Sequence, residues 1–336
     1  MIATTTTFAS SPLFLIAVLL HIALVLYNST PLLSTTAAAL SVDYYSTPCP
    51  SAETTVKIAV RQGLAADPTL AAALLRLHFH DCFIQGCDAS VLIDSTEENT
   101  AEKESPLNKS LRGYELVDAV KLVLEEACPG VVSCADILAM AARDAVFFAG
   151  GPGYEIAKGR KDGRRSRIED AVKLPQPGFN VSDLLTLFGR HGFSTRDLVA
   201  LAGGHTLGVA RCSSFKNRLA HFDAAHQVDP SMNSHFAGTL TQICRLGDGT
   251  PVPFGYSPVT FDNDYFVLLQ MGKGLLFSDQ ELLSGSQTTT GEIVNAYAAS
   301  EAMFFVDFQQ AMVKMGLLDV KGDDEGEVRL NCRRVN

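Results

Sequence analysis

The first 40 residues contain no charged side chain, so the entire formal net charge of −10 belongs to the rest of the chain. This acidic balance argues against nucleic acid or an anionic membrane surface as the main partner. No C-x-x-C pair occurs among the eight cysteines, which gives a zinc-ribbon site little support. No internal repeat and no break in composition interrupts residues 40–336, so the sequence predicts one continuous domain there.

The uncharged leader carries an apolar run at residues 13–27, which is followed by the small-residue stretch STTAAAL. This pattern predicts a secretory signal peptide over residues 1–39 that is cleaved near Ala39. The run is shorter than the roughly 20 residues that span a bilayer, and a signal anchor is the alternative interpretation. After cleavage we expect a secreted protein without a membrane segment.

All eight cysteines lie beyond the predicted cleavage point. An even number of cysteines in a secreted chain predicts four disulfides, although counting alone leaves about 105 ways to pair them.

The sequence of residues 40–336 is typical of a mainly α-helical protein with minor short β segments. Asp67 is the expected N-cap of a helix that begins at the following proline and runs through His80. Ser133 is the expected cap of a second helix. Extended structure is predicted only in fragments such as residues 154–157 and 327–330.

Arg76 and His80 stand four residues apart, so on a helix they project from the same face. A permanently charged guanidinium beside a neutral imidazole suits a reaction in which a base takes a proton while negative charge develops nearby. A surface arginine beside a packed core histidine is the alternative interpretation of this pair alone.

Oxygen side chains alternate around a glycine directly after His80. Asp81, Asp88 and Ser90 supply side-chain oxygens, and the backbone carbonyls of Ile84 and Gly86 complete the set that calcium prefers. Cys82 and Cys87 bracket the same turn at a spacing that could close a small disulfide loop. The alternative is a solvated polar turn, which does not explain the two cysteines.

His205 follows Gly203 and Gly204 at the end of an apolar helical pattern. The glycines either let a bulky group approach the backbone closely or simply end the helix. If His205 binds a metal, its other ring nitrogen should donate to a carboxylate, and Asp279 is the candidate partner. A structural histidine is the alternative.

The chain contains the segments RLHFHDCF, GCDAS, VVSCADILAMAARDAV, LPQP, LAGGHTLG and FDNDYF. With these segments taken together, the chain resembles the class III secretory plant peroxidases, and the resemblance covers essentially all of residues 40–336. The resemblance implies a haem-peroxidase fold, in which haem b lies between a distal and a proximal helical half.

The resemblance also implies a role for individual residues. His80 would be the distal acid–base residue, Arg76 its charge-stabilising partner and Asn108 the hydrogen-bond acceptor that keeps His80 basic. His205 would be the axial ligand of the iron, with Asp279 as its carboxylate partner. Three more residues would surround these groups: Phe79 shielding the distal face, Glu102 in the distal network and Pro175 lining the access channel for aromatic donors.

The implied activity is the reduction of hydrogen peroxide coupled to one-electron oxidation of small phenolic or aromatic donors. The implied protein is a monomer in the extracellular cell wall or apoplast, with Asn180 as its expected glycan acceptor. The alternative is a catalytically weak, calcium-binding, wall-associated glycoprotein of the same fold. The implied disulfides are Cys49–Cys128, Cys82–Cys87, Cys134–Cys332 and Cys212–Cys244.

The proximal calcium loop departs from the family pattern. Alignment places Phe254 where the family usually carries an aspartate, and an aromatic ring cannot coordinate a hard cation. We therefore expect one tightly bound calcium at the distal loop and a weak or empty proximal site. The residues that could form this second site are Thr206, Ser257, Thr260 and Asp262.

Overall fold

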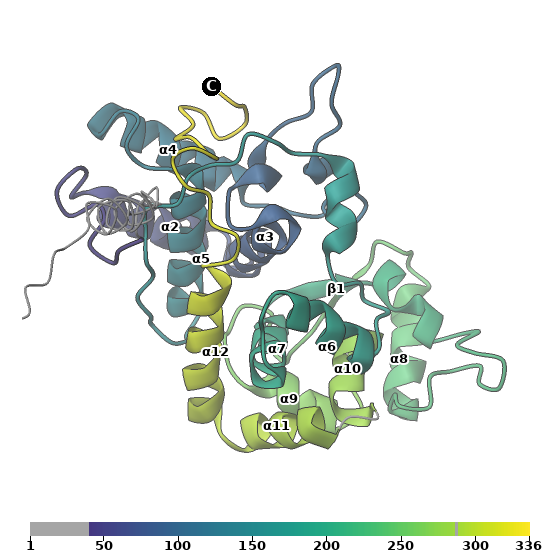
Figure 1. Cartoon of the computed structure of the whole chain (residues 1–336). Coiled ribbons are helices and arrows are strands. Elements are labelled where there is room, and N and C mark those ends of the chain that lie inside the picture. The colour runs from purple at the N-terminus through teal and green to yellow at the C-terminus, as the bar shows by residue number, and fades with distance from the viewer. Residues whose placement is uncertain (1–39, 286–287) are drawn as a thin grey trace, which may run out of the picture. The chain divides into compact units, whose positions relative to one another are not determined.

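The computed structural model describes residues 40–285 and 288–336, and the predicted signal peptide lies outside them. Helices dominate this part of the chain, as Figure 1 shows, so the mainly α fold class is confirmed. The N-terminal helices are α2 (Ala52–Ala66), α3 (Leu70–Gln85), α4 (Tyr114–Ala127) and α5 (Cys134–Phe148). The C-terminal helices are α6 (Val181–Arg190), α7 (Thr195–Ala202), α8 (Ser234–Cys244), α9 (Asp264–Gln270), α10 (Phe277–Ser284), α11 (Thr288–Ala299) and α12 (Glu301–Met315). No helix within the described ranges is long and apolar enough to cross a membrane.

Short 3-10 turns and one small sheet connect these helices. The turns lie at Ser90–Leu92, Glu102–Glu104, Ile168–Lys173, Gly203–Thr206, Cys212–Ser214 and Lys216–Arg218. Strands β1 (Val209–Arg211) and β2 (Pro251–Pro253) pair antiparallel, with Ala210 opposite Val252.

The predicted extended fragment at residues 154–157 is wrong, because these residues form no strand. At 327–330 only Glu327 pairs, in an isolated bridge with Asp162. The observed strands escaped prediction because each has three residues, too few to show alternation.

The N-terminal half packs around α5. Helices α2, α3 and α4 all contact α5, and every residue from Cys134 to Val146 is buried. A helix that is enclosed on all sides needs an apolar sequence around its whole circumference, which the alanine-rich segment ADILAMAA supplies. Ser133 caps this helix as predicted, because its Oγ accepts a hydrogen bond from the Asp136 amide at 3.1 Å.

In the C-terminal half, α12 packs on α7 and α11. Helix α11 also contacts α9 and α10. Figure 1 places α7, α9, α10 and α11 together on the side of the molecule away from α2 and α4. Phe304 of α12 lies against the rings of Phe261, Phe266 and Tyr297. The turn Gly203–Thr206, which follows α7, packs on this aromatic cluster through Gly203.

Helix α3 begins at Leu70, two residues after the predicted start. The reason lies in the side chain of Asp67, which accepts hydrogen bonds from the amide and hydroxyl of Thr69. This local turn satisfies the aspartate before the helix starts, so Asp67 does not cap it.

The four disulfides join Cys49–Cys128, Cys82–Cys87, Cys134–Cys332 and Cys212–Cys244, which are the pairs that the family resemblance implied. The third of these ties the C-terminal segment to the start of α5.

The C-terminal segment covers the turn that follows α3. The Cys87 amide donates to the Leu318 carbonyl at 3.0 Å. Gly86 has φ +96°, and a Cβ atom there would lie 2.5 Å from the Asp319 carbonyl oxygen. Only glycine accommodates both this backbone angle and this close approach. The tail after α12 therefore determines the path of the loop at residues 86–90.

Candidate active site

Arg76 and His80 lie on one face of α3, as their spacing predicted. The Nε atom of Arg76 donates to Nε2 of His80 at 3.1 Å. The guanidinium is held by two further hydrogen bonds, to Ser110 Oγ at 2.9 Å and to the Leu107 carbonyl at 2.8 Å. Arg76 therefore carries a fixed positive charge beside the ring nitrogen that can accept a proton.

Asn108 fixes the tautomer of His80. Its side-chain amide donates to the Glu102 carbonyl at 2.8 Å, so its oxygen must face His80 Nδ1, which lies 2.7 Å away. An oxygen acceptor requires the proton to sit on Nδ1. Nε2 then carries the lone pair, which accepts the hydrogen bond from Arg76 in this structure and is the position that can take up a proton.

Two effects determine the protonation of His80. Burial and the nearby positive charge of Arg76 together lower its pKa to about 3, although the hydrogen bond to Asn108 acts in the opposite direction. The imidazole is therefore neutral at neutral pH, as a general base must be.

The distal network continues from Asn108 to the loop after α3. The carboxylate of Glu102 accepts from Gln85 Nε2 at 2.9 Å and from Ser90 Oγ at 3.1 Å. Burial raises the pKa of Glu102 to about 8. A chain of hydrogen bonds thus connects Ser90, one of the predicted calcium ligands, to the ring of His80.

Of the predicted distal calcium residues, Asp81, Gly86, Asp88 and Ser90 lie together at this loop, whereas the Ile84 carbonyl is bound by Lys173. Asp81 and Asp88 are both buried, and burial raises the pKa of each carboxyl, with Asp88 raising that of Asp81 further. Lys321 Nζ lies 4.0 Å from Asp88 Oδ2, and Lys173 Nζ donates to the Ile84 carbonyl at 3.1 Å. Two buried carboxylates that repel each other, set among hydroxyl and carbonyl oxygens, suit a divalent hard cation.

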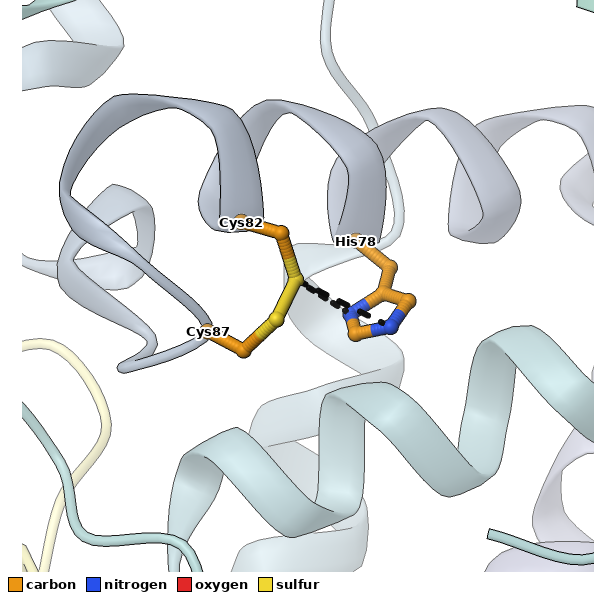
Figure 2. A group of neighbouring side chains, drawn as sticks. All are labelled: His78, Cys82 and Cys87. Carbon is orange, nitrogen blue, oxygen red and sulfur yellow. Dashed lines mark hydrogen bonds between the residues drawn. A yellow bond between two sulfur atoms is a disulfide. The ribbon is translucent and has the colours of Figure 1, made fainter. Parts of the chain in front are cut away.

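His78 lies on another face of α3, beside the disulfide of this loop. Figure 2 shows its ring next to the sulfur of Cys82, with Nδ1 at 3.6 Å. His78, Cys82 and Cys87 lie close enough together to resemble a metal site, but both sulfurs are consumed by the disulfide. A disulfide sulfur cannot act as a thiolate ligand, so this cluster is structural.

His205 lies in the turn Gly203–Thr206, which follows α7. Its Nδ1 atom is 2.8 Å from Asp279 Oδ1, and the Asp279 side chain is only 3 % exposed. Tyr265 Oη donates to the same carboxylate oxygen at 3.1 Å, and the Leu276 amide donates to the other at 3.3 Å. These bonds hold the carboxylate in place, and Nε2 remains the nitrogen that can bind a metal.

Gly203 permits this turn to pack against the aromatic cluster. A Cβ atom at this position would lie 2.4 Å from the ring of Phe304. The interpretation of the glycine pair as a site of close approach is therefore correct for Gly203.

The ring of Phe254 stacks on His205, with centroids 4.5 Å apart and an interplanar angle of 2°. The expectation that Phe254 provides no calcium ligand stays a prediction, and its stacking on His205 was not predicted from the sequence. The residue that faces the loop is Gly255, where a Cβ atom would lie 3.2 Å from the Thr206 carbonyl oxygen. The ring of Phe254 points to the imidazole of His205, on which it packs, and not into the loop.

The other proximal loop residues are brought together around this point. Thr206 Oγ1 donates to Asp262 Oδ1 at 2.5 Å, and Ser257 Oγ lies 2.9 Å from Thr260 Oγ1. One carboxylate and three hydroxyls meet here. That is less negative charge than at the distal loop, where Asp81 and Asp88 are both present.

Of two further predicted residues, Phe79 borders the site, whereas Pro175 is placed only by the segment that carries it. The ring of Phe79 lies edge-on to His80, with centroids 5.9 Å apart. Pro175 follows the turn Ile168–Lys173, in a segment that the hydrogen bond from the Ser278 amide to the Pro177 carbonyl ties to α10. Sequence reasoning missed Gln85, Phe254 and Tyr265 as parts of the site, because a glutamine or an aromatic residue in an apolar pattern carries no functional signal by itself.

The donor set fits a haem. His205 offers Nε2 from a side chain that is 42 % exposed, and its Nδ1 is bound to a carboxylate, the arrangement that a ligating histidine requires. His80 has no such carboxylate and keeps a free base beside a fixed cation. His205 thus has the hydrogen-bond arrangement of a metal-binding imidazole and His80 that of a neutral base, which is the pattern expected of a haem-dependent redox enzyme.

Comparison with known proteins agrees with this class. The family model described as Peroxidase matches residues 56–300. Peroxidase 47 of Arabidopsis thaliana is 58 % identical over 89 % of this chain and 90 % of its own length. Peroxidase 64 and Peroxidase 66 of the same plant are 48 % and 46 % identical, over 88 % and 89 % of this chain and 93 % of each relative. The chain belongs to the peroxidase family, and its resemblance to the class III plant enzymes is confirmed.

Burial of His78 leads to a prediction about how the free energy of unfolding changes with pH. Burial lowers the pKa of His78 to about 3. The unfolded chain takes up a proton at this residue near pH 6.5, whereas the folded protein does not until pH 3, so His78 makes the folded state less stable as the pH falls. His78→Leu should therefore lose less unfolding free energy between pH 6.5 and pH 4 than the wild type, by up to about 3 kcal/mol.

Urea unfolding of both proteins at the two pH values measures this difference. His235→Leu, at an exposed position of α8, is the matched control and should follow the wild type. Equal pH dependence in wild type and His78→Leu would show that His78 is not held neutral.

Proposed function

We propose that this peroxidase binds haem b and reduces hydrogen peroxide while oxidising small phenolic donors by one-electron steps. The observation that carries the proposal is the state of His80. Its Nε2 is unprotonated, it touches the guanidinium of Arg76, and its Nδ1 is held by Asn108. A neutral base beside a fixed cation is what heterolysis of a peroxide requires.

His205 would hold the iron through Nε2, and Asp279 would make that imidazole more electron-donating through the hydrogen bond at Nδ1. Haem, when bound, would hold the two oxidising equivalents that peroxide supplies and would pass them singly to donors. Phe254 would support the ligand from the side, because its ring lies flat on the imidazole.

On the distal side, His80 Nε2 would accept the proton of the bound peroxide and return it to the departing oxygen, so that one side chain serves as base and then as acid. Arg76 would stabilise the negative charge that develops on that oxygen. Asn108 would keep the ring oriented throughout, because it holds the proton at Nδ1. Pro175 would line the approach of aromatic donors.

The alternative of a catalytically weak wall glycoprotein has no observation in its favour. It would need neither the contact between Arg76 and His80 nor the amide that orients the ring.

The four disulfides support an oxidising compartment, and with the predicted signal peptide they support secretion to the cell wall or apoplast. We propose residues 40–336 as a single haem-binding domain that acts as a monomer. Asn180 is exposed, and its side-chain oxygen caps α6 by accepting from the Asp183 amide at 2.9 Å. This leaves its amide nitrogen for a glycan, whereas Asn108 is buried and its nitrogen is bound.

The acid–base role of His80 is tested by His80→Ala. This variant should retain haem, because the proximal ligand is unchanged, but should react with peroxide at least ~100-fold more slowly, since general acid–base catalysis contributes that much. Stopped-flow spectroscopy of the haem band after mixing with peroxide measures the rate, with phenol oxidation as a second readout.

His235→Ala, which removes an exposed histidine elsewhere, should behave as the wild type. A near-normal rate in His80→Ala would contradict the assignment, and a protein that takes up haem yet oxidises no phenol would contradict the proposed activity.

The calcium content is tested by a substitution at Gly255. We propose one tight calcium, held by Asp81, Ile84, Gly86, Asp88 and Ser90, and a weak proximal site that lacks one carboxylate. Gly255→Asp would place a carboxylate beside the Thr206 carbonyl and should therefore raise the calcium retained after mild chelation from about one to about two ions per haem, because ligand charge sets calcium affinity.

Metal analysis of the washed protein measures the ratio. Gly249→Asp adds the same charge to the preceding loop and should leave the ratio at about one. Two ions retained by the wild type, or no gain in Gly255→Asp, would contradict this account of the proximal loop.

A further inference from the structure

The exposed side chain of Tyr256 has no role in the proposed mechanism. It is 64 % exposed, whereas the other tyrosines within the described ranges are partly or fully buried. The chain contains no tryptophan, and the described cysteines are all in disulfides. Tyr256 is therefore the phenol on this surface that is both readily oxidised and open to large molecules.

A short covalent path connects Tyr256 to the proximal histidine. Only Gly255 separates it from Phe254, so their Cα atoms are at most about 7 Å apart. The ring of Phe254 lies flat on the ring of His205 at a centroid distance of 4.5 Å. The path from solvent to the proposed iron-binding imidazole thus consists of three residues, Tyr256, Gly255 and Phe254, and one ring stack.

Backbone hydrogen bonds hold this path in place. The Phe254 amide donates to the Gly208 carbonyl at 3.2 Å, and the Gly208 amide donates to the Pro258 carbonyl at 2.8 Å. Both ends of the short loop that carries Tyr256 are therefore attached to the residue before β1. Electron transfer weakens steeply with distance, so a fixed, short path favours it.

Met271 orients the phenol at the surface. Tyr256 Oη lies 3.6 Å from Met271 Sδ, and Met271 is itself 43 % exposed. A thioether is a weak hydrogen-bond acceptor, so it positions the hydroxyl without removing its proton. The phenolic proton can leave to solvent when the ring is oxidised.

Tyr265 is the competing tyrosine, because its ring centroid lies 6.0 Å from that of His205. It is buried, and its hydroxyl donates to Asp279. A radical formed there could not meet a donor in solution. Of these two tyrosines near His205, Tyr256 is the one that a donor can reach.

We propose that Tyr256 is a second, surface site of donor oxidation, which serves phenols attached to molecules too large to reach the haem. The inference rests on the proposed haem peroxidase function. Hydrogen peroxide supplies the oxidising equivalents. Tyr256 gives one electron inward and one proton to water, and a donor phenol then transfers one hydrogen atom to the Tyr256 oxygen. The cycle leaves Tyr256 unchanged and releases one donor phenoxyl radical for each equivalent.

The test compares free tyramine with tyramine coupled to dextran as donors for the haem-loaded enzyme. In Tyr256→Phe, oxidation of the dextran-bound phenol should fall by roughly tenfold or more, whereas oxidation of free tyramine should stay within about twofold of wild type. Tyr44→Phe is the matched control, because Tyr44 packs on Tyr45 at the N-terminal end of the domain and should change neither rate.

A second readout does not depend on donor turnover. Wild-type enzyme treated with peroxide and a nitroso spin trap, without donor, should carry the trap on the peptide that contains Tyr256, and Tyr256→Phe should lose this adduct. An unchanged rate with the dextran-bound donor, or an adduct on Tyr265 alone, would overturn the proposal. If wild type oxidises neither donor, the proposed peroxidase function fails, whereas loss of the surface site alone leaves oxidation of free tyramine intact.

Discussion

The hydrogen bond at Nδ1 of each functional histidine is the interaction on which the site depends. His80 and His205 are the same chemical group, yet Nδ1 of the first faces a neutral amide oxygen and Nδ1 of the second a carboxylate. A carboxylate makes an imidazole a stronger electron donor, and an amide fixes the tautomer without adding charge. We therefore propose that the acceptor at Nδ1 determines which imidazole binds iron and which one moves protons.

The surrounding fold serves to hold these two acceptors. Asn108 is held by a backbone carbonyl, and the Glu102 side chain of the same network contacts Ser90 in the loop after α3. Asp279 is held by Tyr265 and by the backbone at the start of α10. Both acceptors are buried and multiply bonded, so each is constrained before any cofactor binds.

Much of this arrangement could be predicted from the sequence, because local rules govern it. The four-residue spacing of Arg76 and His80 placed them on one helical face, and Ser133 capped α5 as expected. The partners Asn108 and Asp279 are 28 and 74 residues away from their histidines, and family resemblance rather than spacing pointed to the first of them.

The sequence was a poor guide where contacts between side chains that no local pattern shows decide which way a side chain points. The stacking of Phe254 on His205 escaped prediction, because alignment offered this residue only as the replacement of a calcium ligand. Asp67 looked like a helix cap, but it closes a local turn with Thr69. In both cases the sequence identified the segment correctly, whereas the direction of one side chain depended on a contact that no local pattern contains.

The most direct test of this account is the ferric/ferrous reduction potential of the haem-loaded Asp279→Asn variant. An asparagine in this position keeps the size of the side chain but removes the charge that makes His205 a strong donor. A less basic imidazole stabilises ferric iron less well, so the potential should rise above that of the wild type while haem remains bound. An unchanged potential would contradict the claim that the acceptor at Nδ1 sets the role of each histidine.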